Sequence, residues 1–125
     1  KQQTEKFQNA LEQPYKEDVY GGKTPEETWA MFLDALKKGD IDLASKYYDV
    51  AHQEKAKKYI NGMDEKSELS IWVKELETLE KSSVTSSVDY SYYSYKYFNP
   101  EFKRYLWSQV VFYFNPYTKV WKIVY

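Results

Sequence analysis

The residues that could move protons are few, and they do not form a strong catalytic pattern. His52 is the only histidine in the 125 residues, and histidine is the side chain best suited to general acid–base catalysis near neutral pH. It lies among polar neighbours in VAHQEK, which favours a solvent-exposed position near the start of a helix. Asp89 is the only acid in a long tyrosine-rich run. If Asp89 faced a cavity, it would suit an acid–base role. It alternates in step with the serines of that run, however, and this predicts that its side chain faces solvent.

The sequence shows no metal, cofactor or nucleotide motif. A single histidine with no cysteine leaves no recognisable set of metal ligands. The net charge of −1 argues against nucleic acid as a partner, because nucleic-acid binders usually carry a basic face. No apolar run approaches the ~18 residues that a membrane span needs. The chain starts at Lys1, so we expect it to be a processed product that an upstream signal or membrane anchor could have preceded.

The stretch DYSYYSYKYF, residues 89–98, contains five tyrosines in ten residues. Tyrosine is a good strand former whose hydroxyl tolerates water, and this favours tyrosines that build a sheet. The alternative is an aromatic platform for a sugar, a peptide or a partner's sheet. For this surface patch the sequence suggests four residues: Tyr93, Tyr95, Tyr105 and Trp107.

The composition of the second half of the chain is typical of an antiparallel sheet. Residues 84–97, 104–114 and 119–125 are rich in Val, Tyr, Phe and Trp and predict three strands. FNP occurs at 98–100 and again at 114–116, which predicts two hairpin connections. The large side chains change phase at Tyr92–Tyr93, and this predicts a β-bulge and a bend there.

The first half of the chain predicts helices, most clearly in KTPEETWAMFLDALKKGD. Thr24, Pro25 and Glu27 are placed as an N-cap, a first helical residue and the partner of a capping box, and Gly39 suits the helix end. Asp40 then caps a short second helix. We expect further helices at 4–13, ending at Pro14, at 51–60, stopping at Asn61-Gly62, and from Asp64 to about Lys81.

Helices followed by a meander predict an α+β fold. We expect a lead-in or linker helix in residues 1–23 and a single domain in residues 24–125. Bulky rings at helical spacing favour a plain core, but they can also line a pocket. The residues expected to line such a cavity are Trp29, Phe32, Tyr47, Tyr48 and Trp72.

The segment TPEETWAMFLDALKKGDIDLASKYYD, residues 24–49, resembles the opening helix pair of the nuclear transport factor 2-like superfamily. The ending NPYTKVWKI, residues 115–123, is similar to the last hairpin of the same proteins. The resemblance implies a cone, in which helices pack in the concavity of a bent antiparallel sheet. The lead-in NALEQPYKEDVYGGKTPEE resembles uncharacterised bacterial proteins whose domain follows a signal or anchor, which implies an extracytoplasmic location.

The fold alone does not fix the function, because this superfamily includes enzymes, transport factors and scaffolds. The missing catalytic set favours a non-catalytic domain that binds an unknown small molecule or protein, with a homodimer through the sheet as one expected form. One alternative is an isomerase- or dehydratase-like enzyme that uses Asp89 or His52 with a cavity tyrosine. A second alternative is a carbohydrate-binding module that uses Tyr105 and Trp107.

Overall fold

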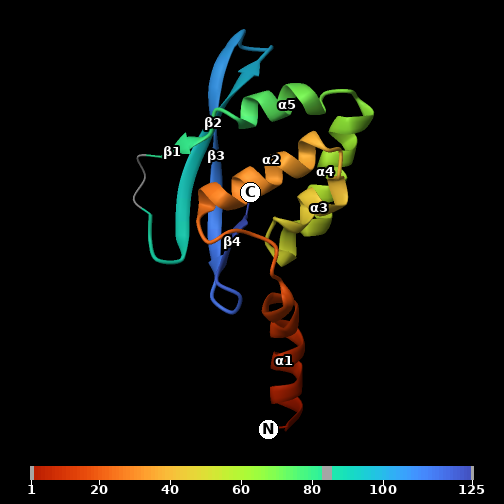
Figure 1. The fold of residues 1–125 in the computed structure, drawn as a ribbon, viewed down its shortest axis with the longest axis vertical. Coiled ribbons are helices and arrows are strands. Elements are labelled where there is room, and N and C mark those ends of the chain that lie inside the picture. The colour runs from red at the N-terminus through yellow and green to blue at the C-terminus, as the bar shows by residue number, and fades with distance from the viewer. Residues whose placement is uncertain (1, 83–85, 125) are drawn as a thin grey trace.

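The computed structural model describes residues 2–82 and 86–124, which form an α+β fold with helices on a four-stranded antiparallel sheet (Figure 1). This confirms the predicted class. In chain order the helices are α1 Gln2–Glu17, α2 Pro25–Lys37, α3 Ile41–Lys46, the 3-10 turn η1 Val50–His52, α4 Gln53–Glu65 and α5 Leu69–Leu76. The strands are β1 Glu80–Lys81, β2 Tyr90–Asn99, β3 Arg104–Asn115 and β4 Val120–Ile123, in the spatial order β1-β2-β3-β4.

Helix α2 begins as its sequence predicts. The Thr24 hydroxyl accepts a hydrogen bond from the Glu27 amide at 3.1 Å, and Pro25 occupies the first turn. The Glu27 carboxylate reaches back to the amide of Lys23 at 2.8 Å. This satisfies amide groups that a helix start would otherwise leave without partners.

The predicted ends of three other helices are wrong. Helix α1 continues through Pro14 to Glu17, and α4 runs through Gly62 to Glu65. The break between α4 and α5 comes at Ser67, which has a positive φ of 59°. The last predicted helix therefore shrinks to Leu69–Leu76. Gly62 is not among the residues with positive φ, so it does not provide the left-handed stop that the sequence suggested.

The predicted bulge in the tyrosine-rich strand is also wrong. Strands β2 and β3 pair without interruption from Tyr90 opposite Tyr113 to Asn99 opposite Arg104. Ser91 is buried on the same face as Tyr93, so the odd residues of β2 face the helices throughout. The change of phase in the sequence arises because this inward position holds a serine, not because an extra residue is inserted. The predicted beginning of the strand at 84 lies outside the described residues.

Both hairpins are present where FNP predicted them, and their turns have the same design. The Asn99 side-chain oxygen accepts hydrogen bonds from the amides of residues 101 and 102, and Asn115 does the same for residues 117 and 118. Each turn ends in a lysine with positive φ, Lys103 at 53° and Lys119 at 60°. The repeated motif is therefore FNPxxK.

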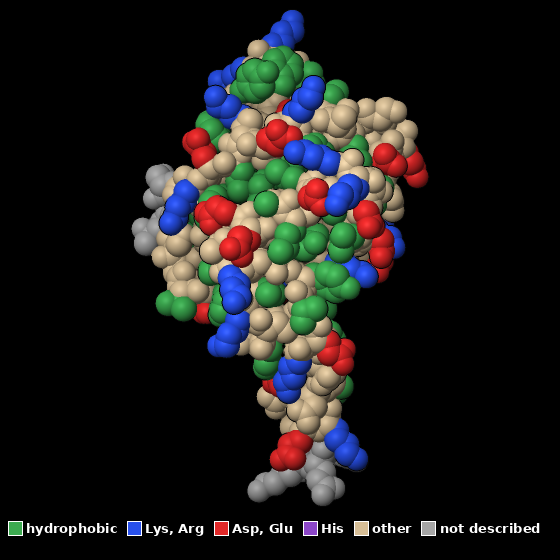
Figure 2. Space-filling model, in the orientation of Figure 1, with side chains coloured by type: hydrophobic (Ala, Val, Ile, Leu, Met, Phe, Trp, Pro, Cys, Tyr) green, Lys and Arg blue, Asp and Glu red, His purple; other side chains and the backbone are tan. Residues whose placement is uncertain are grey.

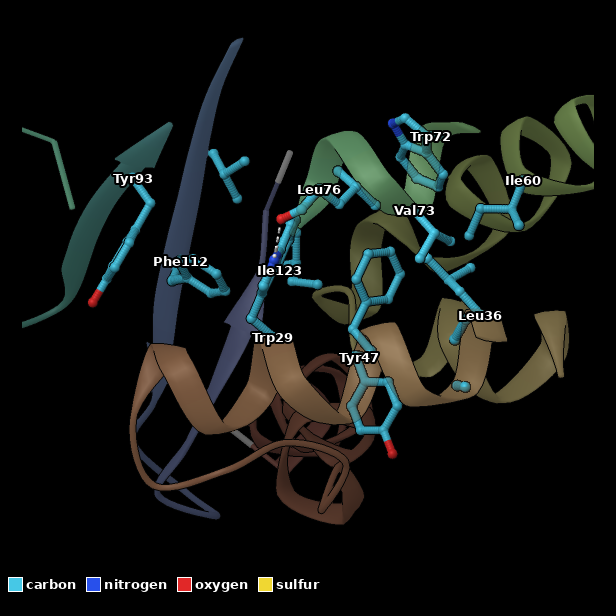
Figure 3. Packing of buried hydrophobic residues seen from close by; sticks show 14 residues of the cluster. Trp29, Leu36, Tyr47, Ile60, Trp72, Val73, Leu76, Tyr93, Phe112 and Ile123 are labelled. Atoms are coloured by element: carbon cyan, nitrogen blue, oxygen red, sulfur yellow. Dashed lines mark hydrogen bonds between the residues drawn. The ribbon is translucent and has the colours of Figure 1, made fainter. Parts of the chain in front are cut away.

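The core lies between α2, α5 and the inward face of the sheet. Trp29 donates its indole N–H to the Leu76 carbonyl at 3.0 Å, which ties α2 to the end of α5 (Figure 3). Phe32 and Phe112 are both fully buried, and the Phe112 ring meets the Trp29 ring edge-on from the sheet side. The buried apolar residues that form this cluster are Trp29, Phe32, Ala35, Leu36, Ala44, Tyr47, Ile60, Trp72, Val73, Leu76, Tyr93, Val110, Phe112 and Ile123.

Other parts of the chain cover both edges of the sheet. On the β2 edge, the amides of Lys96 and Phe98 donate to side chains of residues 78 and 75 at 2.8 Å each. On the β4 edge, Trp121 donates to the Gly22 carbonyl, and Ile123 exchanges backbone bonds with residues 47 and 49. Covered edges do not pair with foreign strands.

The lead-in contacts the domain closely, although its boundary at residue 23 stays a prediction. The Lys122 ammonium, fully buried, bonds the Asp18 carboxylate at 3.0 Å and the carbonyls of Tyr20 and Lys46. Asn115 donates to the Tyr15 carbonyl at 2.9 Å. Helix α1 projects from this anchored segment, away from the sheet (Figure 1). No helix in the described ranges is long and apolar enough to cross a membrane.

Candidate functional site

A groove of about 440 Å³ opens between α4 and the segment that follows β4. This volume falls within the range of pockets that hold small molecules. Tyr48, between α3 and η1, forms its floor and bridges to Ile123. Helix α4 and η1 supply one wall through side chains about one turn apart. The lining residues are Tyr48, His52, Lys55, Ala56, Tyr59 and Val124.

Three tyrosines lie near one another, Tyr48 and Tyr59 at this groove and Tyr95 at a smaller cavity that Tyr48 also borders. Burial raises the pKa of Tyr48, and the nearby hydroxyls of Tyr95 and Tyr59 raise it further. Burial also raises the pKa of Tyr59, with Tyr95 as the next cause. With their pKa values raised, Tyr48 and Tyr59 keep neutral hydroxyls at physiological pH, and a neutral phenol can both donate and accept a hydrogen bond. The three tyrosines form what we call the tyrosine cluster: Tyr48, Tyr59 and Tyr95.

A smaller cavity of about 70 Å³ lies behind the groove, inside the fold. Trp29 and Trp72 come from the helices, Tyr95 and Val110 from the sheet, and Tyr48 borders both spaces. Trp29 is held by its bond to Leu76, so this wall is fixed before any ligand arrives. The tyrosine hydroxyls of the groove therefore lie next to a cavity that is lined mainly by aromatic side chains.

The five residues expected to line a cavity are in different places. Trp29, Tyr48 and Trp72 line the inner cavity. Phe32 is fully buried and meets the rings of those three residues at 5.2 to 6.2 Å between centroids. Tyr47 points elsewhere and meets Tyr20 edge-on at 6.5 Å. Phe32 is thus a core residue, and Tyr47 does not belong to this cavity.

The two acid–base candidates are not brought together. His52 lines the groove with 41% of its side chain exposed, and its Nδ1 lies 3.7 Å from a carboxylate oxygen of Asp49. That distance exceeds a hydrogen bond, and His52 Nδ1 has no hydrogen-bond partner. Asp89 is exposed just before β2 and is not among the groove residues. Within the described ranges, no group of three or more candidate ligands could hold a metal ion.

The aromatic surface patch was predicted only partly in the right place. Tyr93 is buried, meets the Phe112 ring edge-on at 5.2 Å, and donates its hydroxyl to the Glu26 carboxylate. It is therefore a core residue. Tyr95 is half-buried and belongs to the tyrosine cluster. Tyr105 and Trp107 lie on the surface of the β2–β3 hairpin.

Sequence reasoning missed Tyr59 and Ala56, although a usable signal was present. His52, Ala56 and Tyr59 follow the i, i+4, i+7 spacing of one helix face. Val124 could not be found in this way, because only the folded chain brings the residues after β4 next to α4.

A second groove, of about 610 Å³, lies between the end of α2 and α5. Its rim is made of solvated charges, among them the exposed Lys37–Glu77 ion pair at 3.3 Å. Such surface pairs are weak and mobile, so this larger hollow offers less defined chemistry than the tyrosine-lined groove. Comparisons of the chain with protein-family models, with curated proteins and with solved structures found no match.

Proposed function

We propose that the chain is a non-catalytic binding domain whose tyrosine-lined groove holds a small, flat and largely apolar molecule with one or two polar groups. The observation that carries this proposal is the tyrosine cluster at the mouth of an aromatic interior. Tyrosine hydroxyls can form hydrogen bonds with the polar groups of a ligand, and indole and phenyl rings cover its apolar part. The proposal includes the nuclear transport factor 2-like cone, an extracytoplasmic location and a homodimer through the outer face of the sheet.

The enzymatic alternative has less support. His52 lines the groove, but its Nδ1 is unbonded and Asp89 does not join it. The carbohydrate alternative needs free ring faces on the hairpin, where sugars stack. The Lys96 ammonium lies 5.4 Å from the Trp107 ring centroid, so one face of that ring is already occupied. The groove therefore remains the better candidate.

The first test is native mass spectrometry of the purified chain beside its denatured mass. We expect an extra non-covalent mass whose release leaves the protein intact. Tyr59→Ala should lower the occupied fraction, because it removes a side chain of the groove wall that is largely exposed. Tyr117→Ala is the matched control, since Tyr117 is an exposed tyrosine outside the groove.

A chain without bound mass that also fails to bind any member of a library of small aromatic acids and phenols would contradict the proposal. Equal occupancy in Tyr59→Ala and Tyr117→Ala would contradict the groove as the place of binding. The same spectra report the oligomeric state, so a strict monomer at every concentration would remove the homodimer from the proposal.

A further inference from the structure

The end of the β2–β3 hairpin carries exposed aromatic side chains that the groove does not use. This segment, residues 96–107, is here called the hairpin tip. Single exposed apolar residues are ordinary on protein surfaces, but four large aromatics on one hairpin are not scattered. Figure 2 shows hydrophobic side chains gathered at the end where the hairpin of Figure 1 projects, with Lys and Arg side chains around them. The four residues and their exposed fractions are Phe98 46%, Phe102 60%, Tyr105 65% and Trp107 50%.

The hairpin tip is also basic. It contains three basic residues, Lys96, Lys103 and Arg104, and one acid, Glu101, in a chain whose net charge is −1. Two of the cations lie on the rings: Lys96 Nζ is 5.4 Å from the Trp107 centroid, and the Arg104 guanidinium carbon is 5.8 Å from the Phe102 centroid. Cations and rings are thus exposed together.

Charges on the neighbouring helix do not cancel this surface. Glu75 and Lys74 of α5 both border a hollow of about 320 Å³ between α5 and the hairpin, so their opposite formal charges offset each other there. The Glu75 carboxylate also accepts a hydrogen bond from the Phe98 amide. Ile71, which is 62% exposed, extends the apolar surface onto the helix. A ligand that approaches the tip therefore meets aromatic rings, one aliphatic side chain and positive charge.

We propose that the hairpin tip docks on the surface of an anionic phospholipid membrane. Tryptophan and tyrosine favour the boundary between lipid headgroups and hydrocarbon, and Lys and Arg bury their stems while their charges stay at the headgroups. Basic side chains near an anionic leaflet add attraction. The shape favours a membrane over a small ligand, because the tip projects beyond the helices (Figure 1) and its four large aromatic side chains are exposed there.

The repeated FNPxxK turn provides a matched pair of charge reversals. Lys103 and Lys119 occupy the same turn position, both with positive φ and both exposed. The measurement is co-sedimentation of the full chain with phosphatidylcholine vesicles that do or do not contain phosphatidylglycerol. We expect binding to the anionic vesicles only, weakening as salt is added. Lys103→Glu should weaken it roughly fivefold or more, and Lys119→Glu should leave it unchanged.

Phe102→Ser separates anchoring by an aromatic ring from attraction by charge. Phe102 is exposed and lies in a turn, so this variant should fold normally and still lose most of the binding. Equal sedimentation with neutral vesicles, equal effects of Lys103→Glu and Lys119→Glu, or no binding at low salt would each overturn the proposal. A Phe102→Ser change in oligomeric mass without any vesicle binding would instead assign the tip to contacts between copies. None of these outcomes bears on ligand binding in the groove.

Discussion

Lys122 connects parts of the chain that are far apart in the sequence. Its fully buried ammonium joins β4 to Asp18 of the lead-in and to the carbonyl of Lys46 at 2.6 Å. Burial lowers the pKa of Lys122, and the Asp18 carboxylate partly opposes this by favouring the charged form. A buried charge of this kind is tolerated only while its partners are present.

Asp18→Ala is therefore expected to lower the free energy of unfolding by about 3–5 kcal/mol, because it leaves the Lys122 charge buried without a carboxylate. Urea unfolding measures this loss. Asp34→Ala is the control, since it breaks the exposed Asp34–Lys38 pair at 2.9 Å and should change little. Adding Lys122→Met to Asp18→Ala should restore much of the stability. Equal losses in Asp18→Ala and Asp34→Ala would show that the buried pair is not critical.

Tyr93 makes stability depend on pH in the alkaline range. Burial, followed by the hydrogen bond to Glu26, raises the pKa of Tyr93 to about 12 from 10.0. The folded state holds this proton more tightly than the unfolded state. The contribution is therefore fully present below pH 10 and lost as pH rises from 10 to about 12. Tyr93→Phe should flatten the fall of unfolding free energy across that window; an unchanged slope would contradict the assignment.

For single residues, the sequence predicted that aromatic side chains line a cavity, but it did not predict correctly which of them do so. Trp29, Phe32, Tyr47, Tyr48 and Trp72 were considered as possible cavity residues beside a plain core, and only Trp29, Tyr48 and Trp72 line the inner cavity. Tyr93 was misplaced because its partners are far away in the sequence: its ring packs against Phe112, and its hydroxyl bonds Glu26, 67 positions away. No pattern within one strand contains that contact.

Helix α4 shows where local signals mislead at the scale of elements. Asn61-Gly62 is a common helix stop, yet α4 continues through it, and Ser67 forms the break instead. Ile60, just before the glycine, is fully buried in the core. Packing of Ile60 therefore keeps the helix regular where its intrinsic preference is weak.

Gly62→Ala tests this correction directly. The added methyl group would meet nothing within 4 Å, and alanine is the better helix former. The variant should therefore gain about 0.5–1 kcal/mol of unfolding free energy. Gly22→Ala is the matched control, because its new carbon would lie 2.3 Å from the Glu27 Cβ and should destabilise the protein. A loss of stability in Gly62→Ala would mean that α4 ends at the glycine after all.

The start of α2 and the two hairpin turns were predicted correctly. The capping residues of α2 and the FNP turns act through bonds to residues two to four positions away. The bulge failed for a different reason. Ser91 is buried but small. The alternation of large and small side chains therefore predicted an irregularity in a strand that is regular. The end of α5 failed because the strand that follows begins by pairing with residues 93 and 94.

For the whole molecule, the lead-in has two parts with different consequences. Phe7 and Leu11 of α1 are exposed, whereas residues 15–22 bond to β4 and to the turn before it. Removing residues 1–13 should leave the thermal unfolding midpoint unchanged. Removing residues 1–22 should abolish cooperative unfolding, because Lys122 and the β4 edge lose their partners. Circular dichroism on heating compares the two; equal midpoints would make the lead-in a simple linker.

The cover over the β2 edge has a consequence for how this protein could fail. Strand β2 contains YSYYSYKYF, a segment rich in tyrosine and poor in charge, which is the kind of sequence that stacks into cross-β fibrils. Two of its outward amides are engaged by Thr78 and Glu75. These two side chains come from α5 and the residues just after it. Local opening of that helix end would therefore free the two β2 amides to pair with a strand of another molecule. The lag time of amyloid formation should therefore follow the fraying of α5, well below the temperature of global unfolding.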